Sequence, residues 1–176
     1  MRRFLFPSVL AALALLVSAC SDTTSSTTDE LGKTTVEEVQ ANSAYAWFQV
    51  GYDAYPTAAG KAIFDSSVAK IKASFDPAQH SITMAVKLNC GCSETQNTFP
   101  QIMKTLDAAG VPRSNVNIYA TDTRLNGIDS IKAAYNINVA PVYIVLKGSD
   151  VKGRIIKAPT TGKTVDQDLA DFFAVP

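Results

Sequence analysis

The sequence predicts an α/β fold with a central mixed sheet flanked by helices and an N-terminal helical extension. Three observations predict it. Short runs rich in β-branched residues alternate with helix-periodic segments from residue 81 onward. Two successive strand–helix–strand units favour a sheet that starts parallel. A polar turn at residues 147–150, between two further apolar runs, predicts a hairpin that adds an antiparallel edge.

The core elements are expected in the order strand 81–88, helix 93–109, strand 116–120, helix 128–135, strand 139–146, strand 151–156 and helix 165–173. Ser93, with Gln96 three residues later, predicts a capping box that begins the long helix. Gly110 is placed to end that helix.

Helical spacing also marks the chain before the sheet. Aromatic residues recur three or four positions apart over residues 36–55, and we expect them to pack onto the domain rather than to form a ligand surface. Pro56 opens a second helix, which Asp76-Pro77 ends.

The first twenty residues have the pattern of an export signal. Two arginines precede an apolar run over residues 4–17, and small residues and Cys20 follow it. The run is shorter than the ~20 residues that a membrane-spanning helix needs. Val17-Ser18-Ala19-Cys20 resembles the bacterial lipobox, which implies that Cys20 is acylated and becomes the first mature residue. The alternative is a plain secreted protein in which Cys20 has no special role.

This signal divides the chain into three parts. Residues 1–19 are predicted to be a lipoprotein signal peptide, residues 20–42 the lipidated cysteine and a flexible linker, and residues 43–176 the domain, with its extension at 43–80. The linker begins with a tract of serine and threonine that has too little apolar surface to fold. The lipobox resemblance implies a protein of the bacterial cell envelope, anchored by its lipid and facing the periplasm. By the same resemblance, Ser21 after the cysteine, where inner-membrane lipoproteins often have Asp, implies an anchor in the outer membrane.

The charge balance of the chain argues against a nucleic-acid partner. Without residues 1–19 the chain has 14 basic and 16 acidic residues, a net charge of about −2. Nucleic-acid binding calls for clustered lysine and arginine, and the sequence has no such stripe. We therefore expect no nucleic-acid partner, and contact with the membrane through the N-terminal lipid.

The chemistry-bearing segment is Cys90-Gly91-Cys92, where the first core strand leads into the long helix. A helix N-terminus stabilises an anion and so favours the thiolate, which is the nucleophile of disulfide exchange. Because Cys20 is assigned to the lipid, Cys90 and Cys92 are each other's natural partners. Disulfides persist in exported proteins, and one that closes so small a ring is expected to be strained and easily reduced.

Three features of the region resemble the thioredoxin family: Gly91-Cys92-Ser93-Glu94-Thr95-Gln96, the helix residue Pro100, and Val139-Ala140-Pro141-Val142-Tyr143. Pro100 lies eight residues after Cys92, as the family's helix proline does after the first cysteine of Cys-x-x-Cys. The resemblance implies that Cys92 is the exposed attacking cysteine and that Thr95 replaces the buried second one. It places Gly91 at the family's tryptophan and Pro141 at its cis proline. Pro141, Ala140 and Gly91 are then the expected substrate-binding residues.

The chain also departs from the family pattern. A second register aligns Cys90 with the first cysteine and Ser93 with the second, but the helix proline then comes two residues late. No Asp or Glu occurs in residues 81–89, so the family's buried acid is missing. These departures leave ordinary thioredoxin-type reductase activity open.

Three functions follow as hypotheses. The first is thiol–disulfide exchange, as an oxidoreductase or isomerase, in which Cys92 attacks a protein disulfide, Cys90 resolves the mixed disulfide, and an external redox partner resets the pair without a cofactor. The second is a non-catalytic domain whose surface around Pro141 binds a protein. The third is a copper(I) or zinc site on the two thiolates. The one histidine, His80, precedes the cysteines, and no metal-ligand set is assigned.

Overall fold

The computed structural model of the chain describes residues 31–176. The predicted signal peptide, the lipidation residue Cys20 and the first part of the predicted linker lie outside the described residues.

A five-stranded sheet forms the centre of the domain. The strands are β1 Gly32–Thr34, β2 His80–Val86, β3 Val116–Ala120, β4 Val142–Lys147 and β5 Asp150–Ile156. Their order across the sheet is β1-β3-β2-β4-β5; β2 and β3 run parallel, and the other neighbours run antiparallel. The strand expected at 139–146 begins only at Val142, because Pro141 has no N–H with which to join the ladder.

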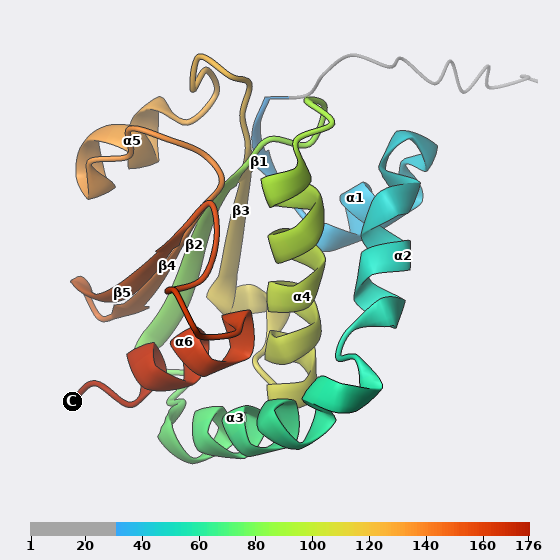
Figure 1. The fold of residues 1–176 in the computed structure, drawn as a ribbon. Coiled ribbons are helices and arrows are strands. Elements are labelled where there is room, and N and C mark those ends of the chain that lie inside the picture. Colours follow the sequence, from blue (N-terminus) through green and yellow to red (C-terminus); the bar gives the residue numbers. More distant parts are fainter. Residues whose placement is uncertain (1–30) are drawn as a thin grey trace, which may run out of the picture.

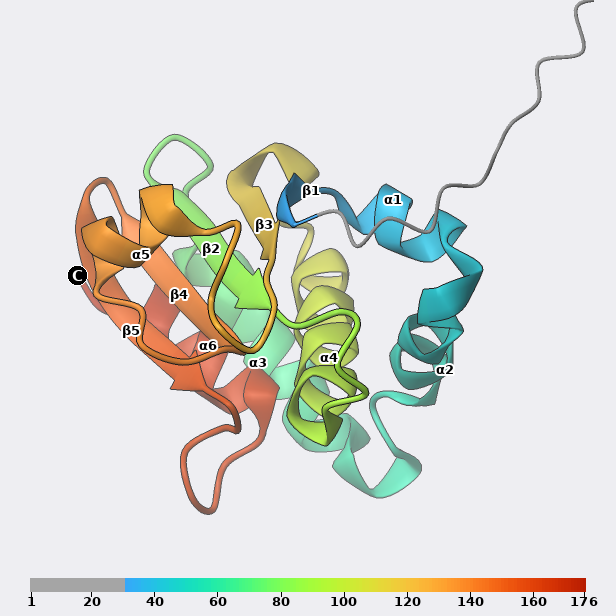
Figure 2. The same cartoon turned by 90° about the horizontal axis from the view of Figure 1, so that it is seen from above.

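Helices cover both faces of the sheet. They are α1 Val36–Ala41, α2 Ala46–Ala54, α3 Lys61–Ser74, α4 Ser93–Ala109, α5 Asp129–Tyr135 and α6 Val165–Phe173. α5 lies on one face, α4 and α6 lie on the other, and α2 packs along the outer side of α4 (Figures 1 and 2). None of the helices within residues 31–176 has the length and apolar character needed to cross a bilayer.

The topology of the core is that of the thioredoxin-like fold. α4 connects the parallel strands β2 and β3, and the β4–β5 hairpin leads into α6. The strand order β3-β2-β4-β5 places the first core strand in the middle of the sheet. The predicted fold class, a mixed sheet flanked by helices, is confirmed.

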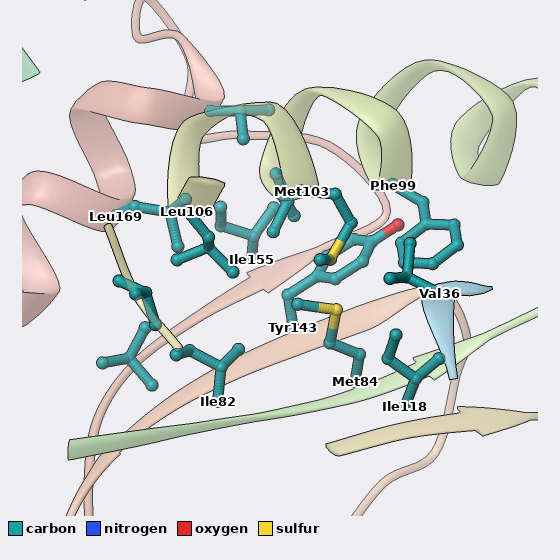
Figure 3. Close-up of a cluster of buried hydrophobic side chains, with 14 of the residues drawn as sticks. Val36, Ile82, Met84, Phe99, Met103, Leu106, Ile118, Tyr143, Ile155 and Leu169 are labelled. Atoms are coloured by element: carbon teal, nitrogen blue, oxygen red, sulfur yellow. The ribbon is translucent and has the colours of Figure 1, made fainter. Parts of the chain in front are cut away.

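The side chains of the central strands alternate between two apolar layers, as the two-residue period of a strand requires. Ile82 and Met84 of β2 belong to the layer under α4, whereas Ala85 belongs to the layer under α5. Figure 3 shows the first of these layers, where the strand residues face Met103 and Leu106 of α4. Both faces of β2 are buried from Ile82 to Val86, and apart from Thr83 this part of the strand is apolar.

The domain begins earlier than the sequence predicts. β1 and α1 lie in the stretch that was expected to be a flexible linker (20–42). β1 pairs with β3, and Val36 and Val39 of α1 are each only 1% exposed. Thr35 and Glu38 form a capping box at the start of α1. The linker prediction is therefore wrong for the residues of β1 and α1, because two buried valines and a local cap outweigh the polar composition around them.

The aromatic residues of α2 pack onto the domain, as expected. Phe48 is fully buried, and its ring lies 5.0 Å from that of Phe99 in α4. The Tyr52 hydroxyl donates a 2.7 Å hydrogen bond to the Asp107 carboxylate near the end of α4. Burial and this hydrogen bond raise the pKa of Tyr52 to about 12. The N-terminal extension is thus held to α4 by both an apolar and a polar contact.

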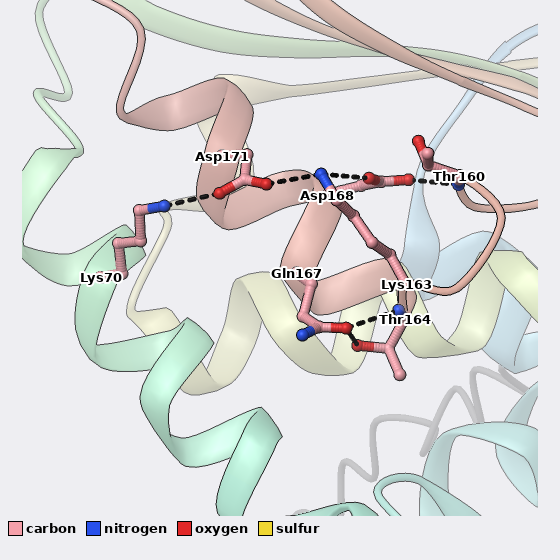
Figure 4. Close-up of polar contacts among 7 residues, drawn as sticks. All are labelled: Lys70, Thr160, Lys163, Thr164, Gln167, Asp168 and Asp171. Atoms are coloured by element: carbon pink, nitrogen blue, oxygen red, sulfur yellow. Dashed lines mark hydrogen bonds and ion pairs between the residues drawn. The ribbon is translucent and has the colours of Figure 1, made fainter.

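Polar contacts fix α6 against α3 (Figure 4). Thr164 and Gln167 form a capping box at the start of α6. The Asp171 carboxylate lies between Lys70 of α3, at 2.6 Å, and Lys163, at 2.7 Å. These lysines lower the pKa of Asp171 through their hydrogen bonds, and the contact joins the last helix to the N-terminal extension.

Candidate functional site

The two cysteines lie where β2 leads into α4. They form a disulfide, with their Cα atoms 5.1 Å apart. Cys92 is the N-cap residue of α4, and its backbone N–H donates to Cys90 Sγ at 3.1 Å. The predicted capping box is therefore wrong: Ser93 is the first helical residue, and the N-cap makes no side-chain hydrogen bond to the helix. The free N–H groups of the first turn of α4 begin directly at the cysteine pair.

Gly91 makes the short connection between the cysteines. Its φ of +60° lies in the left-handed region, and no atom lies within 4 Å of the position that a Cβ would occupy. The backbone therefore favours glycine here for conformational reasons, whereas the space around it is open.

Two buried threonines, Thr95 and Thr98, lie in the first two turns of α4. Thr95 is fully buried, and its hydroxyl has no hydrogen-bond partner in the described part of the chain. One turn further, the Thr98 hydroxyl donates to the carbonyl of Glu94 at 2.5 Å, so the 2.7 Å contact with the Tyr143 hydroxyl has Tyr143 as the donor. Burial raises the pKa of Tyr143 well above its usual range, which keeps this hydroxyl protonated. Thr95, which the resemblance aligns with the second cysteine of Cys-x-x-Cys, is thus a buried residue without a thiol.

The Ala140–Pro141 peptide bond is cis, as the resemblance implies. Pro141 directly precedes β4, and Val142 pairs with Ala85 near the end of β2. The cis bond therefore lies at the end of the sheet from which the cysteine segment departs. Ala140 is 2% exposed, so its side chain is part of the floor of this region.

Two hollows lie near the disulfide and the cis bond, one beside Cys90 and the other beside Ala140. The first has a volume of about 170 Å³ and is lined by Leu31, Asn89, Cys90, Thr121, Asp122 and Thr123. The second has a volume of about 290 Å³ and is lined by Lys87, Thr123, Arg124, Leu125, Asn138, Val139 and Ala140. Thr123 borders both hollows, so they lie side by side between Cys90 and Ala140, and we call the pair the groove.

Most of the residues that line this groove are not marked by any motif in the sequence. Leu31 enters through β1, whose Gly32 pairs with Ala120 of β3. A Cβ on Gly127 would lie 2.6 Å from Cβ of Leu31, which shows how closely the loop and the N-terminal segment approach. Leu31 carries no local signal of this role. Lys87 is only three residues before Cys90, so its place near the site could be expected from the sequence.

The buried carboxylates of the domain belong to α6 and not to the cysteine segment. Asp166 and Asp168 are at most 1% exposed. Asp166 accepts a hydrogen bond from Tyr55, and the Asp168 carboxylate accepts one from the backbone N–H of Thr160 at 2.6 Å. Asp166 thus holds the N-terminal extension to α6, and Asp168 holds the loop that precedes α6.

The geometry rules out His80 as a metal ligand beside the cysteines. His80 begins β2, whereas Cys90 follows the other end of that strand. Seven strand residues at ~3.3 Å each put about 20 Å between these ends. His80 is instead buried, and its Nδ1 accepts the backbone N–H of Asp76 at 2.9 Å. No group of three or more potential metal ligands occurs within residues 31–176.

No protein-family model matches the sequence, and no curated protein matches it. Among solved structures, the chain is similar to the crystal structure of thioredoxin O2 from Arabidopsis thaliana in the oxidized state. The two are 20% identical over 59% of this chain and 78% of that chain, with a TM-score of 0.34. At this distance the likeness assigns no residue roles to this chain.

Proposed function

We propose that this chain is a thiol–disulfide exchange protein of the bacterial cell envelope, held at the outer membrane through acylated Cys20. The observation that supports exchange is the Cys90–Cys92 disulfide at the start of α4, at the same end of the sheet as the cis Ala140–Pro141 bond. Support for the anchor comes from the lipobox resemblance alone.

In the proposed reaction Cys92 is the nucleophile of the reduced pair. The N-cap position favours its thiolate, because the dipole and free N–H groups of α4 stabilise a negative charge there. The Cys92 thiolate attacks one sulfur of a substrate disulfide, forms a mixed disulfide, and expels the other substrate sulfur as a thiolate. Cys90 then attacks Cys92 Sγ, which releases the second substrate thiolate and forms the Cys90–Cys92 disulfide. Two electrons have then passed to the substrate, and an external dithiol partner returns the pair to the reduced state.

The same steps in reverse oxidise a substrate dithiol. The reduction potential of the pair decides the direction, and an external disulfide partner then resets it. The groove between Cys90 and Ala140 would receive the polypeptide around the substrate cysteine. Thr95 takes no part in electron transfer, because a hydroxyl cannot form a disulfide.

A trapping experiment tests the two cysteine roles. The Cys90→Ser variant should accumulate a mixed disulfide with a disulfide-bonded substrate protein, because nothing resolves it. The Cys92→Ser variant should form none and should lose turnover. If Cys92→Ser exchanges as fast as the unchanged chain, the assignment is wrong; if only Cys92→Ser traps substrate, the two roles are reversed.

The reduction potential of the pair separates exchange from the non-catalytic alternative. A potential between about −270 and −120 mV lies in the range of known exchange proteins and supports the proposal. A potential below about −300 mV indicates a structural disulfide and favours a binding domain. That alternative has its own support in the absence of a thiol at position 95.

A further inference from the structure

The hollow next to Ala140 is lined by basic residues and by no acidic ones. Lys87 and Arg124 both line this second hollow, which we call the basic hollow, and no acidic side chain lines it. Lys87 comes from the segment after β2, and Arg124 comes from the loop after β3. Two segments distant in sequence therefore each contribute a basic residue to the lining of the same hollow.

Neither cation forms a direct ion pair within residues 31–176, and the charge of Arg124 is felt by the nearby Asp122 carboxylate, whose pKa is lowered by hydrogen bonds from Asn126 and also by this charge. Within residues 31–176 the ends of the Lys87 and Arg124 side chains take part in no ion pair or hydrogen bond, whereas Lys61, Lys70, Arg113, Lys152 and Lys163 each have an acidic partner. Two unpaired cations in a recess attract a carboxylate more strongly than either does alone.

The nearest groove acid, Asp122, is occupied by its own loop. It lines the first hollow, beside Cys90. Its carboxylate accepts hydrogen bonds from the backbone N–H of Arg124 at 2.8 Å and from the backbone and side-chain amides of Asn126 at 3.0 and 2.6 Å. Asp122 therefore lines the hollow beside Cys90, whereas Lys87 and Arg124 line the hollow beside Ala140.

We propose that the basic hollow binds a carboxylate of the substrate polypeptide, so that the chain prefers protein disulfides with Asp or Glu close to the cysteine that it attacks. This inference rests on the proposed function, since it names the substrate class for the same groove. The carboxylate would contact Lys87 and Arg124 while the substrate cysteine lies at the Cys90–Cys92 end.

The test measures binding separately from exchange. Fluorescent peptides carry one S-methylated cysteine and a Glu, or a matched Gln, at one, two or three positions from it on either side. Their dissociation constants are measured by anisotropy with the full chain in uncharged detergent micelles. Two exposed charge contacts of ordinary strength correspond to a preference for Glu of about fivefold at low salt. The preference should disappear near 1 M salt, where the Debye length is about 3 Å.

The double variant Lys87→Gln/Arg124→Gln should lose the preference for Glu. The matched control Lys72→Gln/Lys147→Gln removes the same charge from α3 and from the far end of β4, and should keep it. Equal binding of Glu and Gln peptides at every position, no binding of either, or equal loss in both double variants would overturn the inference. Disulfide forms of the same peptides then report exchange. A Glu preference in binding without any exchange overturns the proposed function and leaves the basic hollow as a recognition site.

Discussion

Replacing Phe48 with alanine tests whether the N-terminal helices belong to the same cooperative unit as the sheet. Phe48 is fully buried, and it packs between Tyr52 in its own helix and Phe99 in α4. Truncation of a buried Phe to Ala costs about 3–5 kcal/mol, from lost burial and from the cavity left behind. With a urea m-value of about 2 kcal/mol/M, the unfolding midpoint should fall by about 1.5–2.5 M.

The chain contains its own probe for this measurement. Trp47 is the single tryptophan, and its ring lies 6.3 Å from that of Phe48. Urea unfolding of the chain without residues 1–20 should give the same midpoint by Trp47 fluorescence and by far-UV circular dichroism. Val50→Ala in the same helix is the control, because Val50 is 70% exposed and its loss should change stability by no more than about 0.5 kcal/mol. A Phe48→Ala midpoint within about 0.5 M of the unchanged chain, or two separate transitions, would refute a single cooperative unit.

Three further predictions concern the site and two titrating groups. Gly91→Ala places an alanine in the left-handed region, which costs about 1–2 kcal/mol in the disulfide form. If the loop relaxes on reduction, the reduced form avoids this cost, and the reduction potential measured in glutathione buffers should rise by about 20–40 mV. An unchanged potential would mean that both redox forms have the same backbone conformation at this residue. Because burial and Asp107 raise the pKa of Tyr52 to about 12, the stability it contributes is present below pH ~10 and is lost as pH rises toward 12. Tyr52→Phe should therefore lose less stability than the unchanged chain between these values, and parallel losses would contradict the assignment. Burial lowers the pKa of His80, so an NMR titration of this single imidazole should have its midpoint below about 6.5, and stability should be lost as pH falls through that range. A midpoint at or above about 6.5 would contradict burial as the main influence on this ring.

The sequence predicts the core of this fold well, because the signals involved are local. The two-residue period of strands and the 3.6-residue period of helices are visible in short windows, and the elements from β2 to α6 appear in the expected order. The aromatic residues of the extension also pack as expected, since a helix with one apolar stripe must bury it.

Local signals were less reliable at the ends of elements. Ser93 was expected to cap α4, but Cys92 occupies the N-cap. Thr35 with Glu38 is a capping box that the polar composition of the linker concealed. Several adjacent residues of suitable chemistry compete for an N-cap, and the course of the preceding chain decides among them.

What the sequence by itself determined is the cysteine pair at the start of a helix and the proline that precedes a core strand. Cys90, Cys92 and Pro141 are each marked by the residues next to them. The groove is different, because Leu31, Lys87 and the loop after β3 meet only through the pairing of β1 and β2 with β3. Only the tertiary structure decides such a site, since the register of a sheet depends on long-range pairing and packing that no short window of sequence contains.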